Sequence, residues 1–219
     1  MRSRLAAAAA LTAMLCCAQA AARPAQRSRC LPRGARTLAV DSGARVVAVG
    51  ARTGPPGPGP AGGERVFACL FTRGDFVRLG APTAGLGEGG VGVVALSGTV
   101  VAYGESTGGI DFFDARVAAL DIATGHQLFD LPAATSTGRP ESFYGVDSIA
   151  ISPRLSVAWI GSRSSIFETP VTYEVHTVLA SGRQATLDCG PGISPGSLRL
   201  AQGTLTWTDG RSSRSAPLP

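Results

Sequence analysis

Residues 93–104 read VVALSGTVVAYG, and this stretch decides the fold. Two apolar runs flank Ser97-Gly98, so the segment predicts a strand, a tight turn and a second strand. The same pattern recurs in TLAVDSGARVVAVG (37–50), SIAISPRLSVAWIG (148–161) and LRLAQGTLTWTDG (198–210). Self-similarity of this kind predicts a repeat that is built from hairpins.

A second hairpin follows three of these four segments. It reads RVFACLFTRGDFVRL (65–79), RVAALDIATGHQLFD (116–130) and YEVHTVLASGRQATL (173–187). The turn glycines Gly74, Gly125 and Gly182 lie 51 and 57 residues apart. Four short strands in roughly 50 residues match the size of a propeller blade.

The sequence therefore predicts an all-β, antiparallel, β-propeller-like array of about three full and one partial four-stranded blades, and it leaves closure of the ring open. The repeats are expected at about 37–79, 91–131, 146–189 and 197–217. Equivalent strand positions hold Val49, Tyr103, Trp159 and Trp207. Their recurrence favours packing between blades, with a ligand platform as the alternative.

A family resemblance agrees with this repeat. The segment ARVAALDIATGHQLFDL (115–131) resembles repeats of the pyrroloquinoline-quinone type, in which a strand ending in Ala-Leu-Asp precedes a Thr-Gly turn. The array over 37–216 is more loosely similar to the WD-repeat and TolB-like propellers of exported bacterial proteins. The resemblance implies a propeller-like fold. It implies no quinone cofactor, because Asp130-Leu131 replaces the usual terminal Trp and the cofactor residues are not found.

The N-terminus has the pattern of a secretory signal. Arg2 and Arg4 precede an apolar run of 14 residues, Leu5–Ala18, and Ala18-Gln19-Ala20 supplies small residues for cleavage. We therefore expect a signal peptide at 1–20, a basic segment at 21–36 and the repeat domain at 37–219. The expected location is secreted or extracytoplasmic, in the cell envelope of a bacterium, and no later stretch suits a membrane span. An uncleaved anchor is the main alternative, and lipoprotein processing at Cys16 or Cys17 is less favoured.

Charge and composition argue against nucleic-acid binding. The net charge is +5, but residues 1–36 hold seven arginines and no acid, while 37–219 holds 13 arginines and 15 acids. The repeat domain thus lacks the excess of positive charge that phosphate binding requires. The chain contains no Lys and no Asn, a bias typical of a GC-rich bacterial genome. We expect a monomer.

Three cysteines follow the signal segment: Cys30, Cys69 and Cys189. Oxidising conditions outside the cytoplasm favour a disulfide, and we expect Cys30 to pair with Cys69 because both belong to the first repeat. Pairing of Cys30 with Cys189 remains the alternative. No metal site is expected, since the chain has no C-x-x-C pair near His126 or His176.

The catalytic motifs are weak. Ser106 in GESTG (104–108) matches G-x-S-x-G, but a nucleophile elbow needs a following helix, and a predicted strand follows instead. GLGEGG (85–90) matches G-x-G-x-x-G, again without a helix to bind phosphate. Asp111 and Asp114 complete no calcium-binding spacing. No catalytic residue is therefore assigned, and the binding residues are unknown.

These observations predict an exported, non-catalytic protein for binding or scaffolding, without a cofactor. Its partner would be a protein, a peptide or a glycan that contacts loops at the rim of the array. Those loops are expected at 51–64, 80–90, 104–115, 132–145 and 162–170. Two alternatives stay open: a secreted serine hydrolase that uses Ser106 with His126 or His176, and a diverged structural protein of the cell envelope.

Overall fold

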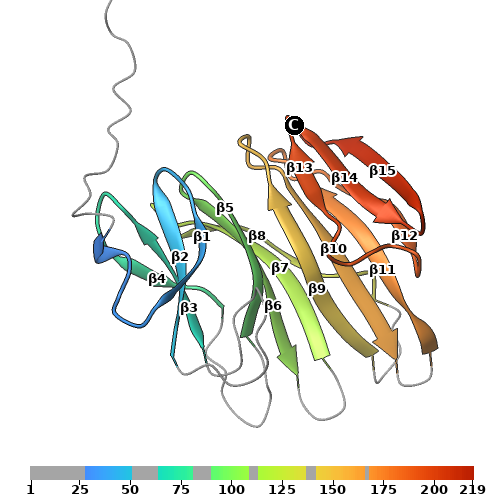
Figure 1. Ribbon diagram of the computed structural model, residues 1–219, viewed down its shortest axis with the longest axis horizontal. Helices are drawn as coiled ribbons and strands as arrows, with labels where there is room; N and C mark the ends of the chain where they lie inside the picture. Colours follow the sequence, from blue (N-terminus) through green and yellow to red (C-terminus); the bar gives the residue numbers. More distant parts are fainter. Residues whose placement is uncertain (1–27, 51–63, 81–89, 109–112, 137–141, 166–167) are drawn as a thin grey trace, which may run out of the picture.

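All fifteen elements of the described chain are β-strands (Figure 1), which confirms the all-β, antiparallel prediction. The computed structural model describes residues 28–50, 64–80, 90–108, 113–136, 142–165 and 168–219. The strands are β1 (Arg36–Val40), β2 (Ala44–Val49), β3 (Arg65–Leu70), β4 (Phe76–Arg78), β5 (Gly90–Ser97), β6 (Val100–Gly108), β7 (Phe113–Asp121), β8 (His126–Pro132), β9 (Ser142–Ile151), β10 (Val157–Ser165), β11 (Glu168–Val178), β12 (Gln184–Gly190), β13 (Arg199–Ala201), β14 (Thr204–Asp209) and β15 (Ser212–Pro217).

The strands form four consecutive antiparallel meanders. Meander 1 contains β1–β4, meander 2 contains β5–β8, meander 3 contains β9–β12, and meander 4 contains β13–β15. Meanders 1 and 4 are separate sheets, whereas meanders 2 and 3 join through β7 and β9 into one eight-stranded sheet. Each strand within a meander pairs with the next one along the chain. One parallel pair, Phe113 with Phe143, joins β7 to β9. The arrangement is a row of sheets (Figure 1), with meanders 1 and 4 at its two ends.

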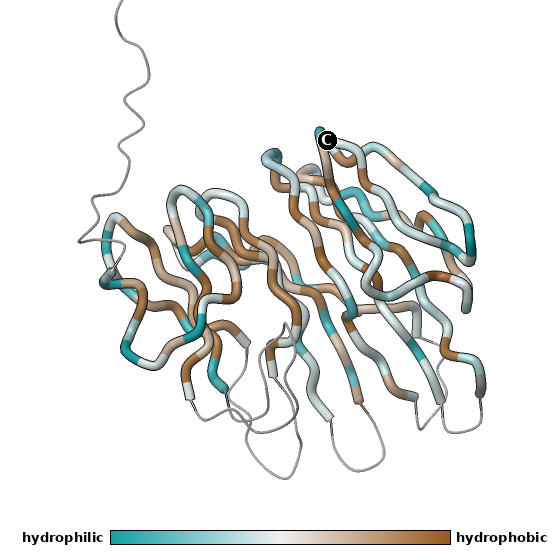
Figure 2. The backbone as a smooth tube through the Cα atoms, in the orientation of Figure 1, coloured by the Kyte–Doolittle hydropathy of each residue, from teal (hydrophilic) through white to brown (hydrophobic). Residues whose placement is uncertain are grey.

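Consecutive meanders bury apolar faces against each other. Figure 2 shows the apolar segments concentrated inside the row. Val46 and Val66 of meander 1 pack with Val101 of meander 2, in one buried cluster. The other face of meander 2 packs on meander 3 through a cluster with Val117 and Val157. Meanders 3 and 4 share the third cluster. Each sheet therefore needs its neighbours, because a single meander would leave a wide apolar face in water.

The aromatic residues at the equivalent strand positions lie in the clusters between consecutive meanders. Tyr103 of β6 is buried in the cluster with meander 1, and Trp159 of β10 is buried in the cluster with meander 2. Trp207 of β14 is likewise buried in the cluster with meander 3. Each ring thus packs toward the preceding meander. Val49 of β2 belongs to the first sheet, which has no preceding meander, and it is half-buried.

A hydrogen bond between turns fixes the first two meanders relative to each other. The backbone N–H of Gly98, in the β5–β6 turn, donates to the Asp41 carboxylate over 2.6 Å. This bond and a second from the Ser42 backbone N–H lower the pKa of Asp41. Gly98 has φ 59°, a left-handed conformation that glycine adopts without a steric penalty.

A disulfide covers the free face of meander 1. Cys30 and Cys69 are paired, as predicted, with Cα atoms 5.6 Å apart. Both are fully buried and cluster with Phe71, whose ring lies under the Arg45 guanidinium at 5.8 Å. Cys189 is an exposed free thiol. The pair is compatible with an extracytoplasmic location.

Several predicted segments lie outside the described residues. They include the signal peptide at 1–20, part of the basic segment 21–36, most of GLGEGG (85–90), and most of the expected rim loops 51–64 and 80–90. The described parts of the expected loops 104–115 and 162–170 are strand residues, and 142–145 of the expected loop 132–145 belong to β9, so the strands extend further into these segments than the sequence predicts. Within the part of the chain that the structure describes, no helix has both the length and the apolar character needed to span a bilayer.

Candidate functional site

The first strands of the four meanders converge on one pocket, named here the central pocket. β1 lies beside β5, β5 beside β9, and β9 beside β13. The central pocket has a volume of about 410 Å³. It is lined by Leu38, Gly92, Val93, Val94, Asp147, Ser148, Ile149, Gly196, Leu198 and Arg199. All four meanders therefore contribute to its wall.

Irregularities in three of these strands coincide with the pocket. The β1–β2 register skips Leu38, and the β5–β6 register skips Gly92 and Val93. The β9–β10 register skips Asp147. The residues of β1, β5 and β9 that these three registers leave out, Leu38, Gly92, Val93 and Asp147, all line the central pocket. Bulges of this kind bend a strand and redirect side chains, and they are frequent beside binding sites.

Two charged residues line the pocket without pairing to each other. Asp147 is half-buried, its Oδ2 atom has no hydrogen-bond partner, and burial raises the pKa of its carboxyl against an opposing bond from Ser162. Arg199 donates through Nη1 to the carbonyl oxygens of Gly196 (2.9 Å) and Leu198 (2.6 Å). Among the ion pairs of the described residues, none joins Asp147 to Arg199.

The rest of the wall is mainly aliphatic. Leu38, Val94 and Ile149 are partly buried, and Leu198 is buried in the cluster between meanders 3 and 4. The Ser148 hydroxyl donates to the Pro195 carbonyl oxygen at 2.8 Å, which fixes β9 to the connection before β13. Among the described residues, the lining contains neither a histidine nor an aromatic ring. Such a pocket suits the reversible binding of a small molecule that is both polar and apolar.

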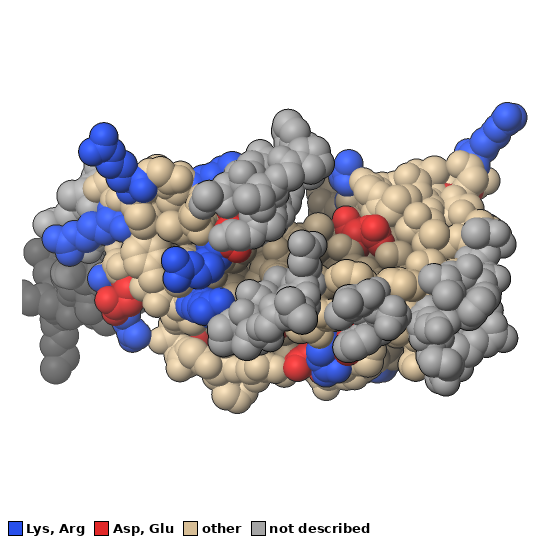
Figure 3. All heavy atoms as spheres, turned by 90° about the horizontal axis from the view of Figure 1, so that it is seen from below, with Lys and Arg blue, Asp and Glu red and all other residues tan. Residues whose placement is uncertain are grey.

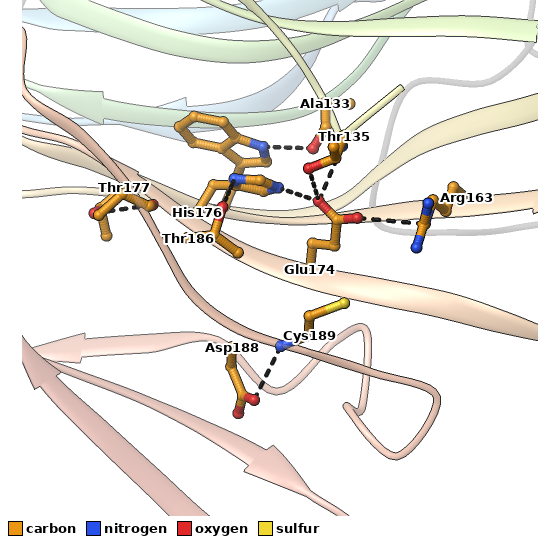
Figure 4. A network of polar contacts seen from close by, with 11 residues as sticks. Ala133, Thr135, Arg163, Glu174, His176, Thr177, Thr186, Asp188 and Cys189 are labelled. Carbon is orange, nitrogen blue, oxygen red and sulfur yellow. Dashed lines mark hydrogen bonds and ion pairs between the residues drawn. The ribbon is translucent and has the colours of Figure 1, made fainter. Parts of the chain in front are cut away.

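A second pocket lies beside a buried polar network in meander 3 (Figure 4). Glu174 of β11 is only 2% exposed, and its Oε2 accepts hydrogen bonds from the Thr135 backbone N–H (2.9 Å) and hydroxyl (2.8 Å). His176 Nε2 lies 2.8 Å from the same oxygen. Arg163 Nε forms an ion pair with Oε1 at 3.3 Å. The network thereby connects meander 3 to the segment that follows β8.

His176 lies between this carboxylate and a hydroxyl. Its Nδ1 atom is 3.1 Å from Thr186 Oγ1, and its ring stacks on Trp159 with centroids 5.2 Å apart. Trp159 Nε1 in turn donates to the Ala133 carbonyl oxygen at 2.8 Å. Trp159, His176 and Thr186 border a pocket of about 360 Å³, which we call the His176 pocket.

Burial and hydrogen bonds shift the pKa values of His176 and Glu174. Burial lowers the pKa of His176, and the attraction of Glu174 only partly opposes this. Burial alone would raise the pKa of Glu174, but the two bonds from Thr135 and the proximity of His176 outweigh it, so the pKa is lowered. A neutral imidazole beside a carboxylate and a hydroxyl can accept a proton at Nδ1.

The structure does not bring the predicted catalytic candidates together. Ser106 lies inside β6, between Gly90 and Ala115 of the neighbouring strands, and its hydroxyl donates to the Gly90 carbonyl oxygen at 3.5 Å. His126 begins β8 and is exposed. Asp114 lies in β7, whereas Asp111 lies outside the described residues. The described residues contain no group of three or more His, Cys, Asp or Glu that could hold a metal ion.

The sequence gives only weak indications of the residues that form the central pocket and the His176 pocket. Glu174 and His176 are two apart in a strand and so lie on one face, and Thr186 is the cross-strand partner of His176. That pairing depends on a bulge next to Val175, which no spacing rule indicates. Asp147 lies at a bulge as well, so alternation alone does not indicate where its side chain lies.

The charge distribution adds no separate site. Figure 3 shows positive and negative side chains interspersed over the described residues of the face that is seen from below. This face offers no continuous surface of either sign. Comparison with known proteins gives no family: no protein-family model matches this chain, and no curated protein sequence matches it.

Proposed function

We propose that the protein is an exported, non-catalytic binding protein, built as an open β-propeller-like array, that holds its ligand in the central pocket. One observation carries the proposal: three separate first strands are irregular at the point where they border the same pocket. A bulge leaves a residue unpaired in its ladder, so three of them around one cavity are unexpected in a fold that serves packing alone.

The propeller-like arrangement rests on the order of the strands. First strands of the meanders lie side by side around the pocket, and consecutive meanders share buried apolar clusters. Radially repeated blades have this organisation, with first strands innermost. Export is supported by the N-terminal pattern and by the buried Cys30–Cys69 pair.

Protein-observed NMR tests the proposal with a library of soluble peptides and oligosaccharides of one to four units. We expect hits to shift the amide signals of Val94, Asp147, Ser148 and Arg199. Gly92→Ile should abolish these shifts, because Gly92 lines the pocket and a bulky side chain there would take up space in it. Gly90→Ile is the matched control in the same strand, since a Cβ there meets nothing within 4 Å. Hits that perturb only residues away from the pocket, or a library without hits, would contradict the proposal.

A second candidate function is ester hydrolysis at the His176 pocket. It is favoured by the order Glu174–His176–Thr186, a carboxylate, an imidazole and a hydroxyl in hydrogen-bond contact. Hydrolysis of p-nitrophenyl butyrate by the wild-type protein, lost in Thr186→Ala and retained in Thr208→Ala, would support it. A fluorophosphonate probe shows which hydroxyl reacts, because label on Ser106 instead of Thr186 assigns the nucleophile to β6. Equal rates in wild type and Thr186→Ala exclude Thr186.

A further inference from the structure

The two charges in the central pocket define the chemistry of its ligand. We propose that the central pocket binds a short peptide with free termini and aliphatic side chains, with the ammonium group at Asp147 and the carboxylate at Arg199. This inference rests on the proposed function, since it names the class of ligand for the same pocket.

Asp147 needs a hydrogen-bond donor. Its Oδ2 atom is buried and has no partner, although the residue lies at a bulge that places it in the pocket wall. Buried polar atoms without partners are rare in native proteins, and each calls for an explanation. A ligand ammonium group carries three donors and a positive charge, so it satisfies the oxygen and stabilises the ionised carboxylate.

Arg199 is exposed and can bind an acceptor through its guanidinium group. Both of its hydrogen bonds use Nη1, and among the described residues Nε and Nη2 have no partner. These two atoms form one edge of the guanidinium group, and this edge fits the two oxygens of a carboxylate. The bonds to Gly196 and Leu198 hold the guanidinium group by its other edge, so the free edge is oriented before a ligand arrives.

Other ligand classes fit the wall less well. A glycan is usually held by ring stacking, and the pocket lining has no aromatic residue. A phosphate or a dicarboxylate would meet the carboxyl of Asp147 as well as Arg199. Leu38, Val94, Ile149 and Leu198 provide aliphatic surface between the two charges. The volume of about 410 Å³ lies within the range of about 300–1,000 Å³ for small-ligand sites.

The test uses the dipeptide Val-Leu, N-acetyl-Val-Leu and Val-Leu-amide as probes in calorimetric titrations of the protein. We expect Val-Leu to bind at least tenfold more tightly than either blocked form. Asp147→Asn should remove the preference for the free amine, and Arg199→Gln should remove the preference for the free carboxylate. Asp75→Asn and Arg211→Gln are matched controls at exposed positions outside the pocket, and they should leave all three affinities unchanged.

The outcomes separate this inference from the proposed function. Equal binding of the free and blocked dipeptides, or no binding of any of them, overturns the peptide assignment. In either case a different hit from the NMR library that shifts Val94 and Ser148 would still support a binding pocket. Folding of Asp147→Asn is checked by its amide spectrum, so that a loss of binding reports on the pocket.

Discussion

At the scale of single residues, Asp147 is the least satisfied group of the pocket. Its carboxyl is half-buried at a β-bulge, and one oxygen has no partner. The fold therefore tolerates the unfavourable free energy of this oxygen at the place where the first strands converge. A substitution could remove the energetic cost of a buried polar atom without a partner. Natural proteins therefore retain such atoms mainly where they serve function.

Replacing Asp147 with Asn should stabilise the protein at neutral pH. Burial raises the pKa of Asp147 above its ordinary value of 3.8, so ionisation is less favourable in the folded chain than in the unfolded one. The wild type then loses stability as pH rises through the folded-state pKa, and Asp147→Asn does not. We expect a gain of about 1 kcal/mol at pH 7. Urea unfolding at pH 3 and pH 7 measures it, and an equal difference at both pH values would contradict the explanation.

The His176 network should make stability fall in two steps on acidification. The pKa of His176 is lowered from 6.5, so the unfolded chain takes up a proton first and stability decreases as pH falls below that value. The pKa of Glu174 is lowered from 4.5, so its contribution is present above pH 4.5 and is lost as pH falls through the lowered value. Unfolding free energies between pH 3 and pH 8 should show both steps in the wild type.

Glu174→Gln provides the corresponding variant. It removes the charge that accepts bonds from Thr135 and His176, and we expect a loss of about 2–3 kcal/mol at pH 7. The difference from wild type should shrink as pH falls below 4.5 and through the lowered pKa of Glu174, because the carboxyl then becomes protonated in the folded protein as well. A loss that is constant across the pH range would show that packing, and not charge, is responsible.

At the scale of strands and connections, the segment after β8 is held tightly against meander 3. The Ala133 carbonyl accepts from Trp159, and the Thr135 backbone N–H donates to Glu174. The same carbonyl lies directly against Gly161 of β10, which leaves no space for a Cβ atom. The glycine is therefore required by close approach of two backbones, not by its φ angle.

Gly161→Ala should destabilise the protein by about 3 kcal/mol, because either the connection or β10 must move. Gly190→Ala is the control, since Gly190 also lies in a β-strand, at the end of β12, and its Cβ would meet nothing within 4 Å. Thermal unfolding of both variants measures the contrast. Similar midpoints for the two variants would show that the connection is not packed on β10 as described.

The sequence predicts the hairpins well and the pockets poorly. Apolar runs around Gly98 and Gly125 indicate strand and turn, because both glycines take the positive φ that their tight turns require. Leu155 and Gln202 take a similar conformation without being glycine, so turn chemistry alone would not place them. The central pocket depends on bulges at Leu38 and Asp147, and a bulge changes the direction of a side chain without changing the hydrophobic pattern.

At the scale of the whole molecule, the row of sheets is finished differently at its two ends. The end of meander 1 is covered by the segment that contains Cys30, which the disulfide holds in place. The outer part of meander 4 is polar, with exposed Thr204, Ser213 and Ser215. Neither end therefore presents a bare apolar sheet, in agreement with the rule that terminal units of a repeat need polar or covered faces.

Removal of the disulfide should weaken the whole array. The double substitution Cys30→Ala, Cys69→Ala releases a loop with a sequence separation of 39, and we expect a loss of about 2–4 kcal/mol. Cys189→Ser should change stability by less than about 0.5 kcal/mol, because that thiol is exposed and unpaired. Guanidinium unfolding compares the three proteins, and equal stabilities would mean that the bridge does not constrain the chain.

The order of the stacked sheets around one pocket is tested most directly by methyl–methyl NOEs in protein labelled at Ile, Leu and Val. The structure predicts cross-peaks from Val66 to Val101, from Val117 to Val157, and from Val175 to Leu205, each across one boundary between consecutive meanders. Cross-peaks that join Val66 to Val175, with the three predicted contacts missing, would contradict the arrangement and with it the central pocket.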